Sequence, residues 1–206
     1  MILIPRNLSK MATLTAKEST KFALTGVNLT VRGDGTYKVA ASDSKIGGII
    51  EGKARHNPDD FPVATDHLPK GKGQAMISAK DWKVGIGKPL SGRLAEAKPV
   101  IGETAVVIGD TVATFVGTDL ERTETHQART LEGRFPPIDE VVPKGKPAMA
   151  VKIDPEMLVK LLKVAQDIRP DGQAFVTLEI FRPDRPLVVR VENEHQNFTG
   201  LIMPLS

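Results

Sequence analysis

The feature that most constrains the fold is a module of about 60 residues that repeats three times along the chain. The last copy is the clearest. Residues 148–153 have the composition of a strand, and Asp154 and Pro155 then predict the cap and first turn of a helix. Strand-like runs follow at 175–181, 187–192 and 198–203. The order is therefore strand, helix and three strands.

The same order recurs in the first two thirds of the chain. In the first copy a polar helix at 8–17 precedes strands at 22–31, 37–43 and 46–53. In the second, a strand at 74–77 runs into a helix that Ser78 can cap, and the later strands lie at 104–108, 112–118 and 123–131. Gly85, Gly87 and Pro89 predict that this helix is short or broken. Short strands joined by turns indicate an α+β fold with antiparallel sheets.

Composition narrows the class of protein. The chain has 206 residues, of which 40% are hydrophobic, so it can bury a core. It has no cysteine, which excludes disulfides, thiolate zinc sites and cysteine nucleophiles, and which fits a reducing cytoplasm. The N-terminal run M-I-L-I-P-R-N is too short for a signal peptide or a membrane span, so we expect no membrane partner.

Sequence motifs typical of metal sites, phosphate-binding loops and catalytic carboxylate pairs are missing. His56, His67, His126 and His195 have no metal-ligand spacing, which favours surface or hydrogen-bonding roles. The glycines of 85–92 lack the P-loop spacing, and the adjacent carboxylates at 59–60 and 139–140 lie beside prolines in extended connections. We therefore expect no enzymatic activity, no cofactor and no metal.

The basic residues are distributed unequally among the helices. The net charge is +3, and phosphate binding needs a cationic face that acidic neighbours do not neutralise. The third helix has an apolar stripe expected to pack on a sheet, and its Lys160 and Lys163 are balanced by Glu156 and Asp167. The stripe comprises Met157, Leu158, Leu161, Leu162 and Ala165. The positive charge is carried by the first two helices, at Arg6, Lys10, Lys17, Lys80, Lys83 and Lys88.

Several stretches together resemble the bacterial DNA sliding clamp, the beta subunit of DNA polymerase III. T-L-E-G-R-F-P-P-I-D-E-V-V-P at 130–143 resembles the exit from the second clamp domain, and G-L-I-M-P-L-S at 200–206 resembles the clamp C-terminus. F-A-L-T-G-V-N-L at 22–29 and V-A-A-S-D-S-K-I at 39–46 resemble two of its strands. The resemblance covers nearly the whole chain and makes 138–143 an extended crossover between domains.

The resemblance implies a DNA-clamp fold with a two-module domain at 1–143, divided at about residue 70, and a third module at 144–206. It implies a processivity factor that binds double-stranded DNA without sequence specificity, through Arg6, Lys10, Lys17, Lys80, Lys83 and Lys88. It also implies a homo-oligomer that tethers a DNA polymerase or other replication or repair protein through a short linear motif. The matching peptide groove comprises Leu24, Ser42, Ser44, Lys45, Ile46, Pro143, Leu201 and Met203.

Two departures leave alternatives open. Clamp subunits have six modules, whereas this sequence has room for three, so ring closure by the usual dimer is in doubt. Lys45 stands where clamps tend to have His or Arg. One alternative is a clamp-fold scaffold or peptide-binding protein that does not encircle DNA. The other is an enzyme on a mixed α+β fold, which only an unrecognised carboxylate pair could support.

Overall fold

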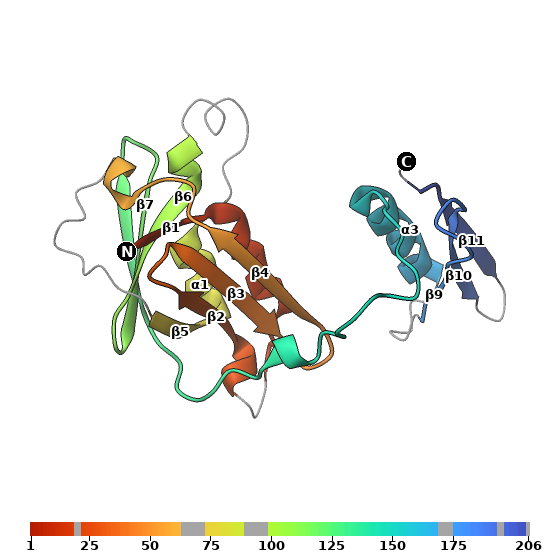
Figure 1. Ribbon diagram of the computed structural model, residues 1–206, viewed down its shortest axis with the longest axis horizontal. Helices are drawn as coiled ribbons and strands as arrows, with labels where there is room; N and C mark the ends of the chain where they lie inside the picture. The colour runs from red at the N-terminus through yellow and green to blue at the C-terminus, as the bar shows by residue number, and fades with distance from the viewer. Residues whose placement is uncertain (19–21, 63–72, 89–98, 169–174, 193–195, 205–206) are drawn as a thin grey trace. The chain divides into compact units, whose positions relative to one another are not determined.

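The computed structural model describes the chain except for residues 19–21, 63–72, 89–98, 169–174, 193–195 and 205–206 (Figure 1). It divides into two compact units, Met1–Pro143 (unit 1) and Lys144–Ser206 (unit 2). Every paired strand is antiparallel, as the sequence predicts for an α+β fold.

Unit 1 contains two four-stranded sheets (Figure 1). One has the order β4-β3-β2-β5, and the other has the order β1-β6-β7-β8. The strands are β1 (Ile2–Pro5), β2 (Gly26–Val31), β3 (Thr36–Ser42), β4 (Gly47–Lys53), β5 (Gly73–Ser78), β6 (Glu103–Ile108), β7 (Val112–Thr118) and β8 (Thr123–Arg129).

Each module of unit 1 gives its first strand to the sheet of the other module. β1 pairs with β6, with Ile2 opposite Val106. β5 pairs with β2, with Ala75 opposite Leu29. Both exchanged strands run directly into helices, the 3-10 helix η1 (Arg6–Leu14) and the α-helix α1 (Ala79–Ile86). The two modules therefore complete each other.

One hydrophobic core joins the two helices to both sheets. η1 contributes Leu8, Met11 and Ala12, and α1 contributes Trp82 and Ile86. The indole Nε1 of Trp82 donates a hydrogen bond of 2.8 Å to the carbonyl of Leu8, so the helices are linked by a polar contact inside an apolar interior. Because a buried carbonyl needs a donor, this bond fixes how α1 lies against η1.

The boundaries of the first helix and the first hairpin strand differ from the sequence expectations, and the second helix agrees with them. The first helix is a 3-10 helix at Arg6–Leu14 rather than a helix at 8–17, and the 22–31 strand starts only at Gly26 because Phe22–Thr25 forms a 3-10 turn, η2. The expected short second helix is confirmed. It ends at Ile86, before Gly87, whose φ of 76° favours glycine.

The 130–143 segment packs against the sheet of β2–β5 in unit 1 and is not a free crossover. Thr130 bridges Ile77 of β5, and the ring of Phe135 packs against Ala40 and Met76. Residues Ile138–Glu140 form a 3-10 turn, η5. The other short 3-10 turns are η2, η3 (Pro58–Asp60) and η4 (Pro99–Gly102). The Lys38 ammonium forms an ion pair with Asp139 of this turn. The extended crossover predicted for 138–143 is therefore wrong over 138–140.

Unit 2 has one helix, α3 (Pro155–Ile168), on a three-stranded sheet of order β11-β10-β9 within the described residues. The strands are β9 (Thr177–Glu179), β10 (Leu187–Glu192) and β11 (Asn197–Ile202). Ala165 is buried and Leu161 packs on Gly200, but Met157 is exposed, so its place in the predicted packed stripe is wrong. Residues 148–153, expected as a strand, are not a strand, and no described residue of unit 2 pairs with them.

Candidate nucleic-acid interface

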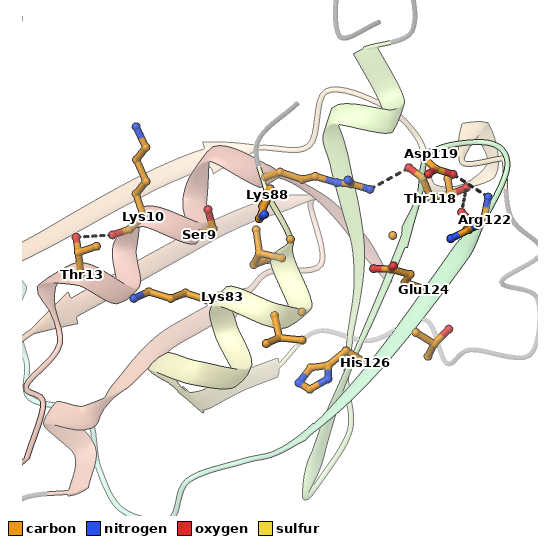
Figure 2. A pocket seen from close by; sticks show the side chains of 17 residues that line it. Ser9, Lys10, Thr13, Lys83, Lys88, Thr118, Asp119, Arg122, Glu124 and His126 are labelled. Atoms are coloured by element: carbon orange, nitrogen blue, oxygen red, sulfur yellow. Dashed lines mark hydrogen bonds between the residues drawn. The ribbon is translucent and has the colours of Figure 1, made fainter. Parts of the chain in front are cut away.

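A groove of about 1030 Å³ lies between η1, the end of α1 and the β7–β8 hairpin (Figure 2). Its walls carry five cationic side chains against the two carboxylates of Asp119 and Glu124. The cationic residues are Arg6, Lys10, Lys83, Lys88 and Arg122. Lys17 and Lys80, predicted to act with them, are exposed but do not line this groove.

The helices turn their lysines outward because their apolar faces are buried. In η1, Leu8 and Met11 enter the core while Lys10 stays in solvent. In α1, Trp82 is buried while Lys83 is exposed. Figure 2 shows Lys10 extending from η1 and Lys83 from α1. Two neighbouring helices therefore present ammonium groups to solvent from one side of the core.

Acidic neighbours do not neutralise these lysines. Asp81, the carboxylate of α1, is engaged elsewhere: its Oδ2 accepts a 2.6 Å hydrogen bond from the Ser78 hydroxyl, and its Oδ1 lies 3.1 Å from His126 Nε2. Among the described residues, Lys10, Lys80 and Lys83 form no ion pair within 4.0 Å. The cationic face is thus free to attract an external anion.

Ser78, Asp81 and His126 do not form a catalytic triad. The carboxylate lies between the hydroxyl and the imidazole, whereas a nucleophilic serine must be bonded to the histidine that takes its proton. Ser78 also caps α1 by accepting from the Asp81 amide at 3.0 Å, as predicted. The sequence expectation of a hydrogen-bonding role is confirmed for His126 and for His56, which contacts Glu103 at 3.0 Å. His67 and His195 lie outside the described residues.

Arg6 differs from the lysines because it is structural. Its Nη2 donates to the Thr118 carbonyl at 2.9 Å and its Nε to the Glu103 carbonyl at 3.4 Å. Burial lowers the pKa of this guanidinium from its usual value, since desolvation disfavours the charged form. Arg6 therefore joins η1 to β6 and β7, and these bonds engage two of its five N–H donors within the fold.

Sequence reasoning missed Arg122, which lies in the β7–β8 turn. The turn is built by Asp119, whose Oδ1 accepts from the amides of Arg122 at 2.7 Å and Glu121 at 3.0 Å. Those bonds lower the pKa of the Asp119 carboxyl, the Arg122 amide most strongly. The available signal was D-L-E-R at 119–122, an Asp followed by a cation in a hairpin loop.

The residues predicted for a peptide groove are divided between the units. In unit 1, Ser42 ends β3, Leu24 precedes β2 and Ile46 precedes β4, so antiparallel pairing brings these positions to one end of the sheet. Leu24 is only 7% exposed, whereas Ile46 is 51% exposed. Ser44 and Lys45 complete the exposed turn, which is held by the Ser42 hydroxyl donating to the Ile46 carbonyl at 2.7 Å.

The other three predicted groove residues are exposed. Pro143 ends unit 1, and Leu201 and Met203 lie at the end of unit 2. Leu201 lines a hollow of about 400 Å³ together with Phe181, Arg182, Arg185, Pro186 and Val188. Met203 does not line this hollow.

A metal-binding cluster and a membrane-spanning helix are both absent from the described residues. No group of three or more His, Cys, Asp or Glu side chains is placed to hold a metal ion there. No helix in the same part of the chain is long and apolar enough to cross a membrane.

Comparison with known proteins identifies the fold. No family model matches the sequence, and no curated protein matches it with significant similarity. Solved structures do match. The DNA polymerase III beta chain of Streptococcus pneumoniae aligns with a TM-score of 0.70 and 15% identity, over 100% of this chain and 49% of that chain. The DNA polymerase sliding clamp of Bacillus subtilis aligns at 0.68 and 16%, over 98% and 48%.

A third match is the sliding clamp of Pseudomonas aeruginosa bound to griselimycin, with a TM-score of 0.65 and 17% identity over 100% of this chain and 50% of that chain. The chain therefore has the fold of the bacterial DNA polymerase III beta sliding clamps, as the sequence resemblance implies. It spans about half the length of the clamp subunits that it matches.

Proposed function

We propose that this protein is a sliding-clamp-like factor that binds duplex DNA without sequence specificity and tethers a polymerase or another replication or repair protein. The proposal rests on two neighbouring helices of a clamp fold, whose exposed Lys10, Lys80 and Lys83 form no ion pair with any described residue. The protein would tether rather than catalyse.

The exposed lysines of η1 and α1, Lys10, Lys80 and Lys83, are called the lysine face. Their chemistry is compatible with movement along DNA. An ammonium group on a flexible stem attracts phosphate oxygens, which are the same for every base pair, so it carries no sequence information. Direct base readout needs side chains fitted to the edges of particular bases, and such contacts would oppose sliding. Loose phosphate contact from Lys10, Lys80, Lys83 and Lys88 is therefore the expected mode of binding.

Binding of the native chain to duplex DNA is expected to fall steeply with salt and to be equal for unrelated sequences. Each phosphate contact that releases a counterion adds about 0.9 to the slope of log affinity against log salt concentration, so three or four contacts give a slope of about −3 to −4. Fluorescence anisotropy with two duplexes of equal length and unrelated sequence measures both properties. Strong preference for one duplex, or affinity unchanged by salt, would contradict phosphate-only binding.

Each unit would supply its own part of a partner-binding surface. Unit 1 exposes Ile46 beside Ser44 and Lys45, and unit 2 exposes Leu201 and Met203, a methionine that can repack around different anchors. The other residues proposed for partner binding are Leu24, Ser42 and Pro143 of unit 1. A short linear motif with hydrophobic anchors is the chemistry that such a surface would take.

Combined replacement Ile46→Ala with Met203→Ala is expected to weaken binding of a labelled clamp-binding peptide by roughly tenfold or more, about 1.4 kcal/mol. These exposed positions are better probes than Leu24, because truncating a buried leucine also destabilises unit 1. Leu120→Ala, at an exposed leucine that is not among the proposed partner-binding residues, is the matched control and should bind like the native chain. Equal binding by the double variant and the control would remove the groove from the proposal.

A further inference from the structure

The described residues of unit 2 form a single module, whereas unit 1 has two modules that complete each other. In unit 1, β1 and β5 each lie in the other module's sheet and run directly into a helix. In unit 2, residues 148–153 lead into α3 in the same way, yet they pair with no strand among the described residues, and no described strand pairs with the outer edge of β9. Within that part of the chain both halves of a strand exchange are present, and neither is paired.

Apolar side chains at the outer edge of β9 are exposed, although they lie on the side of the sheet that packs against α3. Leu178 pairs with Val189, which pairs with Gly200 on its other side, so Leu178 is on the face of the sheet that Leu161 of α3 contacts. Leu178 is nevertheless 49% exposed, and Ile180, two positions further on and just beyond β9, is 46% exposed. Leu29, which pairs with Val39 in β3 as Leu178 pairs with Val189 in β10, is fully buried beside β5.

One side of α3 also exposes apolar side chains. Met157 is 48% exposed and Val164 is 44% exposed. They are seven positions apart, so they share one side of the helix, next to the stripe that meets the sheet. In unit 1 the corresponding flanks of η1 and α1 cover each other, and the bond from Trp82 to Leu8 crosses that contact. α3 has no second helix among the described residues of unit 2.

We infer that two copies of this chain pair through unit 2, each adding its 149–153 segment as a strand to the β9 edge of the other while the two α3 helices pack together. The inference goes beyond the proposed function, since it holds whether or not the protein binds DNA. A second copy is the fitting occupant because it supplies both missing parts at once, a strand for the edge and a helix for the flank.

The register of unit 1 predicts the register of this pairing. Leu29 lies opposite Ala75, three positions before Ser78, and Val106 lies opposite Ile2, three positions before Pro5. Ser78 and Pro5 each immediately precede a helix. The residue preceding α3 is Asp154, so Val151 should lie opposite Leu178.

Antiparallel pairing from that point produces an apolar match. Met149 comes opposite Ile180, and Ile153 comes opposite Val176. With Val151 and Leu178, three apolar pairs then face the α3 side of the sheet, where they bury the residues now exposed. A shift of one residue would turn the segment over and put Lys152 on that face, so the sequence selects this register.

Two chains paired in this way would have about the length of one clamp subunit, since this chain covers 49% of the Streptococcus pneumoniae beta chain and 50% of the Pseudomonas aeruginosa clamp. The pair would hold three two-module domains, one of them built from both copies of unit 2.

A cysteine pair tests the exchange directly, because the native chain contains no cysteine. Directly opposite residues of antiparallel strands have Cβ atoms about 4.5–5.5 Å apart, close enough for a disulfide after small adjustment. Val151→Cys with Leu178→Cys should therefore give a covalent dimer under mild oxidation on a non-reducing gel. Lys152→Cys with Leu178→Cys, on opposite faces, should remain monomeric on the gel. A bridge within one chain, or no bridge, would overturn the inference.

Sedimentation equilibrium of the full chain provides the second test. The native chain should be dimeric, and Leu178→Lys should weaken dimerisation at least roughly tenfold, because it places an ammonium group in the apolar seam. Leu201→Lys, which puts the same change on the other face of the sheet, should leave the dimer intact. Circular dichroism shows whether each variant is folded. A monomeric native chain, or equal dimerisation of both folded variants, would overturn the inference.

Discussion

Replacing Lys10, Lys80 and Lys83 together with Glu is expected to reduce duplex affinity by roughly 10²–10³-fold at 0.1 M salt. Each lost phosphate contact removes about 0.9 from the salt slope, which is about eightfold per contact at that concentration, and three contacts multiply. The new carboxylates add repulsion. The loss should be uniform across sequences and should shrink as salt rises, because phosphate contacts carry no base information. Fluorescence anisotropy over a salt series measures it.

The matched control has the same change in net charge at exposed lysines that belong to neither η1 nor α1. Lys53→Glu with Lys144→Glu and Lys146→Glu should bind much more nearly like the native chain. Equal losses in the two triple variants would mean that net charge alone attracts DNA. Unchanged affinity in the helix variant would remove the lysine face from the proposed function while leaving the dimer inference intact.

Replacing Trp82 with Ala is expected to lower the free energy of unfolding of unit 1 by about 3–5 kcal/mol. The side chain is fully buried, and its ring meets Phe115 edge-on with centroids 6.1 Å apart. Its removal would leave a cavity and would also leave the Leu8 carbonyl without its indole donor. Urea unfolding followed by circular dichroism is the suitable measurement, since the change removes the only tryptophan.

A second substitution separates packing from hydrogen bonding at this position. Trp82→Phe keeps an aromatic ring but cannot donate to Leu8, so it should cost less than Trp82→Ala and still be measurably destabilising. A loss below about 1 kcal/mol for Trp82→Ala would show that η1 and α1 are not held together through this residue. Because the lysines of the two helices share this support, the alanine variant should also bind DNA less well at temperatures near its unfolding transition.

Taken alone, the sequence determined the hairpins, the short second helix, the capped third helix and the absence of cysteine chemistry. These are local properties. Alternation of apolar side chains, Ser78 as a cap and Gly87 after α1 act within a few residues, and they have the same effect in any surrounding fold.

Tertiary structure alone decided how the modules combine and which charges are free. The patterns of Ile2–Pro5 and Gly73–Ser78 suit either sheet, and only packing placed each strand beside the other module. Only the folded chain turned Asp81 toward Ser78 and His126, and among the described residues Lys83 forms no ion pair within 4.0 Å. Residues 148–153 are the clearest example of a segment whose structure depends on tertiary contacts. Their composition predicts a strand, but the hydrogen bonds of a strand come from its neighbour, and within the described part of unit 2 no neighbour is present.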